Sequence, residues 1–252
     1  QLKKGSTFSL HNELEVDVAK LLKKNIPSAE MSRFGKNGAN LSTFADFWGY
    51  KVEAYDAVPY NVALIEAAGG TPILNSDSGE RVRRLNHDAA KMVRWGGMTY
   101  QDAIQTITLN PAIALKLDDV VGSIEVGKRA DLALFNGHPL NTYSRAFMTI
   151  IDGEIVFERE GERGGPYPLD EKSGVVASLP NRSEDGVYAI TNAAIFPGSA
   201  PPIQQGTLLI RDGKIAAVGD GGMAVPEGAT IVDGSNLNVY PGFIDGGSTV
   251  AN

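Results

Sequence analysis

Apolar and polar positions follow two different rhythms along this chain. Up to Leu117, short apolar runs are followed by longer segments with helical spacing, a pattern typical of βα units on a parallel sheet. The first run, residues 6–11, predicts a strand, and residues 13–24 place their leucines and Val18 on one helical face. After Leu117 the period falls from 3.6 to 2, which predicts a change from βα units to short strands.

Two more βα units follow the first. Residues 43–48 come after a Gly/Asn/Ser-rich stretch and contain an aromatic loop, and residues 55–68 predict a helix. Residues 71–77 form the clearest apolar run of the chain and end in a carboxylate, with a helix expected over residues 80–95.

Helix starts are marked by two polar signals. Thr99 with Asp102 resembles a capping box at the start of one helix, and Asn110-Pro111 is expected to cap and begin another.

The later part of the chain predicts a β-layer. Residues 121–127 and 130–136 are expected to be short strands, and residues 147–157 a hairpin that turns at Asp152-Gly153. The same Asp-Gly turn recurs at Asp212-Gly213. Further strands are expected over residues 187–196, 206–219 and 230–239, whereas residues 158–184, rich in Gly, Pro, Ser and charge, are interpreted as a linker.

Composition narrows the classes of function. The chain of 252 residues is 42% hydrophobic, which excludes a disordered tail, and it has no apolar run of the ~18 residues that a membrane span needs. A net charge of −7 argues against nucleic acid as a partner. Cysteine is absent, so a metal would have to be bound by His, Asp, Glu or a modified Lys. The compartment cannot be read from this sequence.

Two polar side chains close predicted strands, at the end of a βα array where ligands bind. Asp77 is costly to desolvate there unless a cation or a helix N-terminus faces it. The alternatives remain open: Asp77 is also placed to cap the helix that starts near Glu80, and His11 is also explained as a histidine satisfied by the next loop.

Other candidates have simpler explanations. Arg81, Arg83 and Arg84 could meet an anionic substrate, or could line a solvated helix face that also carries His87. His138 is most simply a loop residue. Lys51 and Glu53 could reach a cavity through the aromatic loop, whose rings are otherwise packing residues. Nucleotide-binding glycine motifs and the serine-hydrolase elbow are absent from the sequence.

Several motifs resemble the C-terminal half of a metal-dependent amidohydrolase of the imidazolonepropionase-like group. They are Asn75-Ser-Asp-Ser78, Arg83-Arg-Leu-Asn86, Gly96-Gly97, Thr108-Leu-Asn-Pro-Ala112 and Val121-Gly-Ser-Ile-Glu-Val-Gly-Lys-Arg-Ala-Asp-Leu132. A second set resembles the beginning of the same family: Tyr188 to Ile195, Gly206 to Gly219 and Val239-Tyr-Pro-Gly-Phe-Ile-Asp245. In that family the last motif leads into a metal-binding His-x-His, but here Gly247 and Thr249 stand at the two histidine positions.

The resemblance implies an α/β fold: a partial TIM-like (β/α)8 barrel of about three βα units plus a small β-sandwich built from the 119–160 and 187–240 segments. Residues 1–118 are expected to form the C-terminal part of the barrel, 119–160 the returning sandwich segment, 161–186 a linker, and 187–252 the opening of a second, degenerate unit. Three βα units do not close an eight-stranded barrel. The missing strands are therefore expected from another part of the protein or another chain, an oligomer included.

The resemblance also implies chemistry. It predicts one or two divalent metals, commonly zinc, with Asp77 as a metal ligand that also passes a proton from water to the leaving nitrogen, and His11 as a second ligand. The other ligands are expected outside this chain, so the isolated chain is expected to be inactive. The predicted function is hydrolysis of an amide or cyclic amide in a small or peptide-like substrate, and the alternative is a non-catalytic scaffold or binding module derived from such an enzyme.

Overall fold

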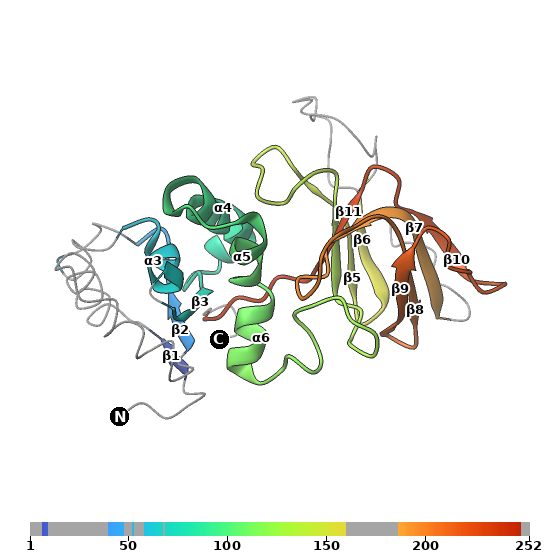
Figure 1. Cartoon of the computed structure of the whole chain (residues 1–252), viewed down its shortest axis with the longest axis horizontal. Coiled ribbons are helices and arrows are strands. Elements are labelled where there is room, and N and C mark those ends of the chain that lie inside the picture. Colours follow the sequence, from blue (N-terminus) through green and yellow to red (C-terminus); the bar gives the residue numbers. More distant parts are fainter. Residues whose placement is uncertain are drawn as a thin grey trace. The chain divides into compact units, whose positions relative to one another are not determined.

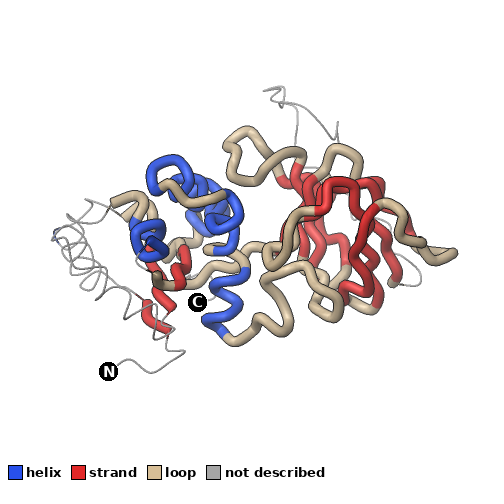
Figure 2. Tube along the Cα trace, viewed as in Figure 1, coloured by secondary structure: helices blue, strands red, loops and turns tan. Residues whose placement is uncertain are grey.

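The computed structural model of this chain describes residues 7–9, 40–47, 52, 58–67, 69–159 and 186–247. Two compact units emerge: residues 1–116 with 243–252, and residues 117–242. Helices gather in the first unit and strands dominate the second (Figure 2). The change of period near Leu117 therefore coincides with the passage from one unit to the other.

A parallel three-stranded sheet organises the first unit. It consists of β1 (Thr7–Ser9), β2 (Asn40–Thr43) and β3 (Thr71–Leu74), in the order β1-β2-β3 (Figure 1). The register pairs Asn40 with Thr71 and Thr43 with Leu74. The parallel arrangement predicted from the alternating pattern is confirmed, and the carboxyl ends of the three strands lie at one edge of the sheet.

Short helices follow the strands. They are α3 (Asn61–Ala67), the 3-10 helix η2 (Arg81–Arg84), α4 (Leu85–Gly96), α5 (Tyr100–Gln105) and α6 (Leu109–Leu115). The helix predicted over residues 80–95 is thus divided into a 3-10 turn and α4. A left-handed Gly97 ends α4, and its N–H donates to the carbonyl of Met92, as expected for a glycine C-cap.

One of the two predicted helix starts is confirmed and the other is wrong. Thr99 caps α5, because its hydroxyl accepts the backbone N–H of Asp102 at 3.1 Å. Asn110 lies inside α6, after Thr108 at the N-cap, and its side-chain amide donates to the carbonyl of Pro72 at 2.8 Å. The side chain of Asn110 thus makes a contact with β3, 38 positions away in the sequence, instead of marking the start of the helix.

One mixed sheet of eight strands forms the second unit, in the order β6-β5-β4-β11-β7-β8-β9 with β10 beside β7. The strands are β4 (Leu132–Phe135), β5 (Ala146–Ile151), β6 (Glu154–Glu158), β7 (Val187–Ile195), β8 (Ile203–Arg211), β9 (Lys214–Asp220), β10 (Thr230–Asp233) and β11 (Asn238–Pro241). β11 is antiparallel to β4 and parallel to β7. Strands of the two predicted sandwich segments therefore pair directly with each other.

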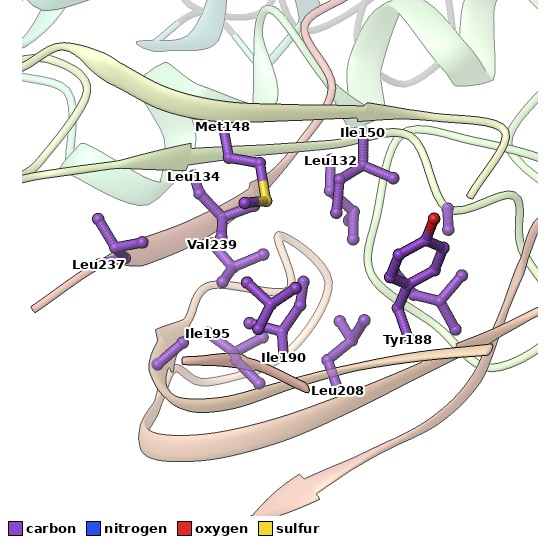
Figure 3. Packing of buried hydrophobic residues seen from close by; sticks show 14 of the residues in the cluster. Leu132, Leu134, Met148, Ile150, Tyr188, Ile190, Ile195, Leu208, Leu237 and Val239 are labelled. Atoms are coloured by element: carbon purple, nitrogen blue, oxygen red, sulfur yellow. The ribbon is translucent and has the colours of Figure 1, made fainter. Parts of the chain in front are cut away.

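The core of this unit lies between two layers of that sheet. Leu134 and Met148 face Ile190 and Ile195 across the interior (Figure 3). Each of these four side chains is at most 1% exposed. The apolar face of the returning segment is thus buried against the apolar face of the opening segment, which joins them into one core.

Two strand predictions differ from the structure. Residues 121–127 form turns instead of a strand. The backbone N–H of Ile124 donates to the carbonyl of Pro197 in a loop, and that of Gly127 donates to the carbonyl of Ile215 in β9. The strand predicted over residues 230–239 is divided into β10 and β11 by a turn at Gly234, where an added Cβ would lie 2.7 Å from the Cβ of Ala193.

Candidate functional site

Asp77 lies just beyond the carboxyl end of β3. The two residues between it and the strand, Asn75 and Ser76, are buried, whereas Asp77 itself is partly exposed. Its backbone is left-handed, with φ +46°, a conformation that aspartate tolerates better than most residues. The sequence interpretation is thus confirmed in one respect: this carboxylate closes a buried strand at the edge where ligands of parallel sheets bind.

The neighbour of Asp77, Ser78, caps the start of the helix that Asp77 was alternatively expected to cap. The hydroxyl of Ser78 accepts the backbone N–H of Glu80 at 3.3 Å and that of Arg81 at 3.4 Å, at the start of η2. A side chain one position further along therefore satisfies these two amides.

A second carboxylate follows the neighbouring strand at the same edge. Thr43 pairs with Leu74, so Asp46 and Asp77 both lie three residues beyond this pair. Asp46 binds Arg81 at 2.8 Å and also pairs with Lys91, whose ammonium is 2.6 Å from Asp88. Two cations and two carboxylates neutralise one another here, which favours a structural role for Arg81 over capture of an anionic substrate.

Burial shifts the pKa values of two members of this cluster, Asp88 and Lys91. Burial raises the pKa of Asp88 to about 6, although Arg81 and Arg84 pull it in the opposite direction, and burial lowers the pKa of Lys91. Asp88 and Lys91 thus form an ion pair that is sensitive to pH, and Lys91 connects it to Asp46 of the aromatic loop.

The aromatic loop is packed. Phe44 is 4% exposed and contacts Phe47 edge to face at 4.8 Å between ring centroids, and the guanidinium of Arg81 lies 4.7 Å from the Phe47 centroid. The packing interpretation of these two rings is therefore supported. Lys51 and Glu53 lie outside the described residues.

The C-terminal segment reaches the loop after β3. A carboxylate oxygen of Asp245 accepts the backbone N–H of Ser76 at 3.0 Å, and its other oxygen accepts the Ser76 hydroxyl. The backbone N–H of Asp77 donates to the carbonyl of Gly247 at 3.0 Å. No local pattern marks Asp245 as a site residue, because only folding brings residues 169 positions apart together.

A divalent metal does not fit the described residues by themselves. The Asp245 carboxylate already accepts three donors: both polar groups of Ser76 and the backbone N–H of Gly247 at 3.1 Å. The buried Oδ1 of Asn75 has no hydrogen-bond partner, so a spare acceptor exists near Asp77. Within the described residues, however, no three His, Cys, Asp or Glu side chains gather as a metal site requires. His11, the second predicted ligand, lies outside the described residues.

The two remaining histidines lie on other elements than the strand that Asp77 closes. His87 lies within α4. His138 lies in a loop of the second unit, as predicted, but also packs edge to face on Tyr240 at 5.7 Å, and burial lowers its pKa. Its ring is part of an aromatic cluster that the sequence did not reveal.

Comparison with known proteins gives three related results. Residues 62–177 match the model of the Amidohydrolase family. The protein named amidohydrolase tasK from Hapsidospora irregularis is 25% identical over 244 residues, which are 89% of this chain and 25% of that protein. An amidohydrolase from Thermotoga maritima MSB8 has 28% sequence identity and a TM-score of 0.48, over 61% of this chain and 37% of the other.

The chain thus spans about a quarter of the length of the curated relative it matches. In the part of the chain that the structure describes, we find no helix long and apolar enough to cross a membrane.

Proposed function

Because residues 62–177 match the Amidohydrolase family model, we propose that this chain belongs to the amidohydrolase superfamily and contributes Asp77 to a hydrolase that cleaves an amide or cyclic amide C–N bond in a small or peptide-like substrate. The observation that carries the proposal is the position of the Asp77 carboxylate. It is partly exposed directly after a buried strand, at the carboxyl edge of a parallel sheet.

The proposed role of Asp77 is proton transfer. Its carboxylate takes a proton from the attacking water and later returns it to the leaving nitrogen, so that the same group acts first as base and then as acid. Hydrolysis breaks the C–N bond, the water oxygen bonds to the carbonyl carbon, and the nitrogen leaves as a protonated amine. Asp77 is partly exposed, which leaves the residue within reach of water and substrate.

We propose a divalent metal, commonly zinc in this superfamily, for the complete protein and not for this chain alone. Asp77 and His11 are the candidate ligands of this chain, and the remaining ligands would come from residues that lie outside it. When bound, such an ion would supply activation of the attacking water.

The experiment uses the complete protein. We expect hydrolysis of at least one member of a panel of N-acyl amino acids, dipeptides and cyclic amides, measured as the appearance of a free amino group. Asp77→Asn should lower kcat about 10²- to 10⁴-fold, because general acid–base catalysis contributes on that order. Asp119→Asn, an exposed carboxylate of the second unit, should leave kcat unchanged.

Metal content separates the enzyme from the second candidate, a non-catalytic scaffold. The scaffold is favoured by Gly247, because the glycine that stands at a resembled histidine position lies against the Asp77 backbone. Stoichiometric zinc that is lost in Asp77→Ala supports the enzyme. Absence of metal from the complete, folded protein, together with no turnover of the panel, supports the scaffold.

A further inference from the structure

Asp245 lies near the end of the described chain and binds the turn that contains Asp77. Its carboxylate accepts the N–H of Ser76 at 3.0 Å, the Ser76 hydroxyl and the N–H of Gly247 at 3.1 Å. The carbonyl of Gly247 in turn accepts the N–H of Asp77 at 3.0 Å. One carboxylate thereby fixes both sides of a bridge between residues 76–77 and 245–247.

The turn at Asp77 requires such support. A non-glycine residue at φ +46° is strained relative to the common backbone regions, and such conformations persist where the surrounding structure fixes them. Ser76 is 1% exposed, so its N–H and hydroxyl need partners within the protein. Asp245 supplies an acceptor to both groups.

The negative charge of Asp245 matters as well as its shape. A carboxylate has only acceptors and takes all three donors at once, whereas the amide of an asparagine would turn an NH₂ group toward one of them. Hydrogen bonds to an ionised acceptor are also stronger than those between neutral groups. Asparagine at this position therefore keeps the size of the side chain but weakens the bridge.

We propose that Asp245 is a positioning residue for Asp77: through Ser76 and Gly247 it sets the backbone that aims the Asp77 carboxylate. The effect of this positioning on catalysis rests on the proposed function, whereas the positioning itself does not. The candidate site is then assembled from two segments that are far apart in the sequence.

The first experiment measures amide hydrogen exchange by NMR on the ¹⁵N-labelled full chain. In Asp245→Asn we expect the Asp77 amide to exchange at least ~10-fold faster than in the unchanged protein. The amides of Leu74, which donates to Thr106, and Asn75, which donates to Thr43, should change less than about twofold, because they belong to the β3 edges rather than the bridge.

Asp220→Asn is the matched control. Its carboxylate accepts the N–H of Gly222 two residues ahead at 3.0 Å, as Asp245 does with Gly247, but it belongs to the second unit and has no bond to Ser76. This variant should leave the Asp77 amide unchanged.

Every outcome decides the proposal. It is overturned when the Asp77 amide exchanges at the same rate in Asp245→Asn, or when Leu74 and Asn75 accelerate equally, since the residue would then only stabilise the fold. If Asp245→Asn does not fold, Ser76→Ala removes the hydroxyl bond to Asp245 from the other side, together with the bonds of that hydroxyl to the Ser78 backbone. The same selective acceleration of Asp77 is then required.

A kinetic experiment on the complete protein tests the catalytic meaning. With a substrate from the panel, Asp245→Asn should lower kcat at least ~10-fold and leave KM within about twofold, as expected when a catalytic group is misplaced but substrate binding is kept. If Asp77→Asn remains active, the proposed function fails, while the exchange experiment still decides whether Asp245 positions Asp77.

Discussion

Gly246 and Gly247 are adjacent and chemically identical, but their surroundings differ. A Cβ added at Gly246 would overlap the Ile73 side chain, whereas one added at Gly247 would lie 3.6 Å from Asn75, an ordinary contact. Packing therefore requires glycine at the first position and accepts a side chain at the second.

We predict that Gly246→Ala lowers the free energy of unfolding by about 1–3 kcal/mol, because overpacking displaces buried Ile73. Gly247→Ala is the matched variant and should change stability by less than about 1 kcal/mol. Urea unfolding of both variants measures the difference. Equal losses would show that the C-terminal segment does not lie on β3 as described.

Asp88 makes stability depend on pH. Its pKa is about 6 in the folded chain, against 3.8 as its ordinary value, so the folded state holds this proton more tightly than the unfolded state. The resulting stabilisation is complete below pH ~3.8 and is lost as pH rises through about 6.

Asp88→Asn should remove this dependence. We compare the unfolding free energy of the variant with that of the unchanged protein. As pH rises from 4 to 7, this difference should shift by about 1–3 kcal/mol in favour of the variant, since one pKa unit corresponds to ~1.4 kcal/mol. Chemical unfolding at several pH values measures the gain, and Asp119→Asn should show none. A constant difference across this range would contradict the raised pKa.

At the scale of elements, the two Asp-Gly hairpins show how much a local signal decides. Asp152-Gly153 and Asp212-Gly213 all have positive φ, from +51° to +76°, as the turn type predicted from these dipeptides requires. Local chemistry was sufficient here because each turn depends on its own two residues. The packing of the turns was not predicted: a Cβ at Gly153 would lie 2.6 Å from the Cα of Gly213.

We predict that Gly153→Ala lowers the free energy of unfolding by about 2–4 kcal/mol, the sum of left-handed strain and the collision with the second turn. Gly127→Ala separates the two causes, because Gly127 has φ +93° but open space around its Cα. It should lose only about 1–2 kcal/mol. Equal losses, measured by thermal or urea unfolding, would refute the contact between the turns.

At the scale of the whole molecule, pairing of distant strands defines the second unit. β11 lies between β4 and β7, and Val239 pairs with Leu134 across the antiparallel junction. Both side chains are fully buried. The returning and opening segments thus share one sheet and one core.

This sharing predicts that the chain stays together after cleavage. With a protease site placed within residues 161–185, the two pieces should elute as one particle in size-exclusion chromatography, because the β4–β11 ladder and its core hold them. Leu134→Asp should release them, since an unpaired charge would be buried at the junction. Separation of the unaltered pieces would contradict the shared core.

The sequence by itself determined what depends on neighbouring residues: the two periodicities, the Thr99 cap, the Asp-Gly turns and the position of Asp77 at a strand end. Tertiary structure alone decided the partners of Asn110, the turns at residues 121–127, the pairing of β4 with β11, and the bond from Asp245 to Ser76. Period and turn chemistry act over a few residues, whereas these partners meet only when burial of apolar surface brings distant segments together.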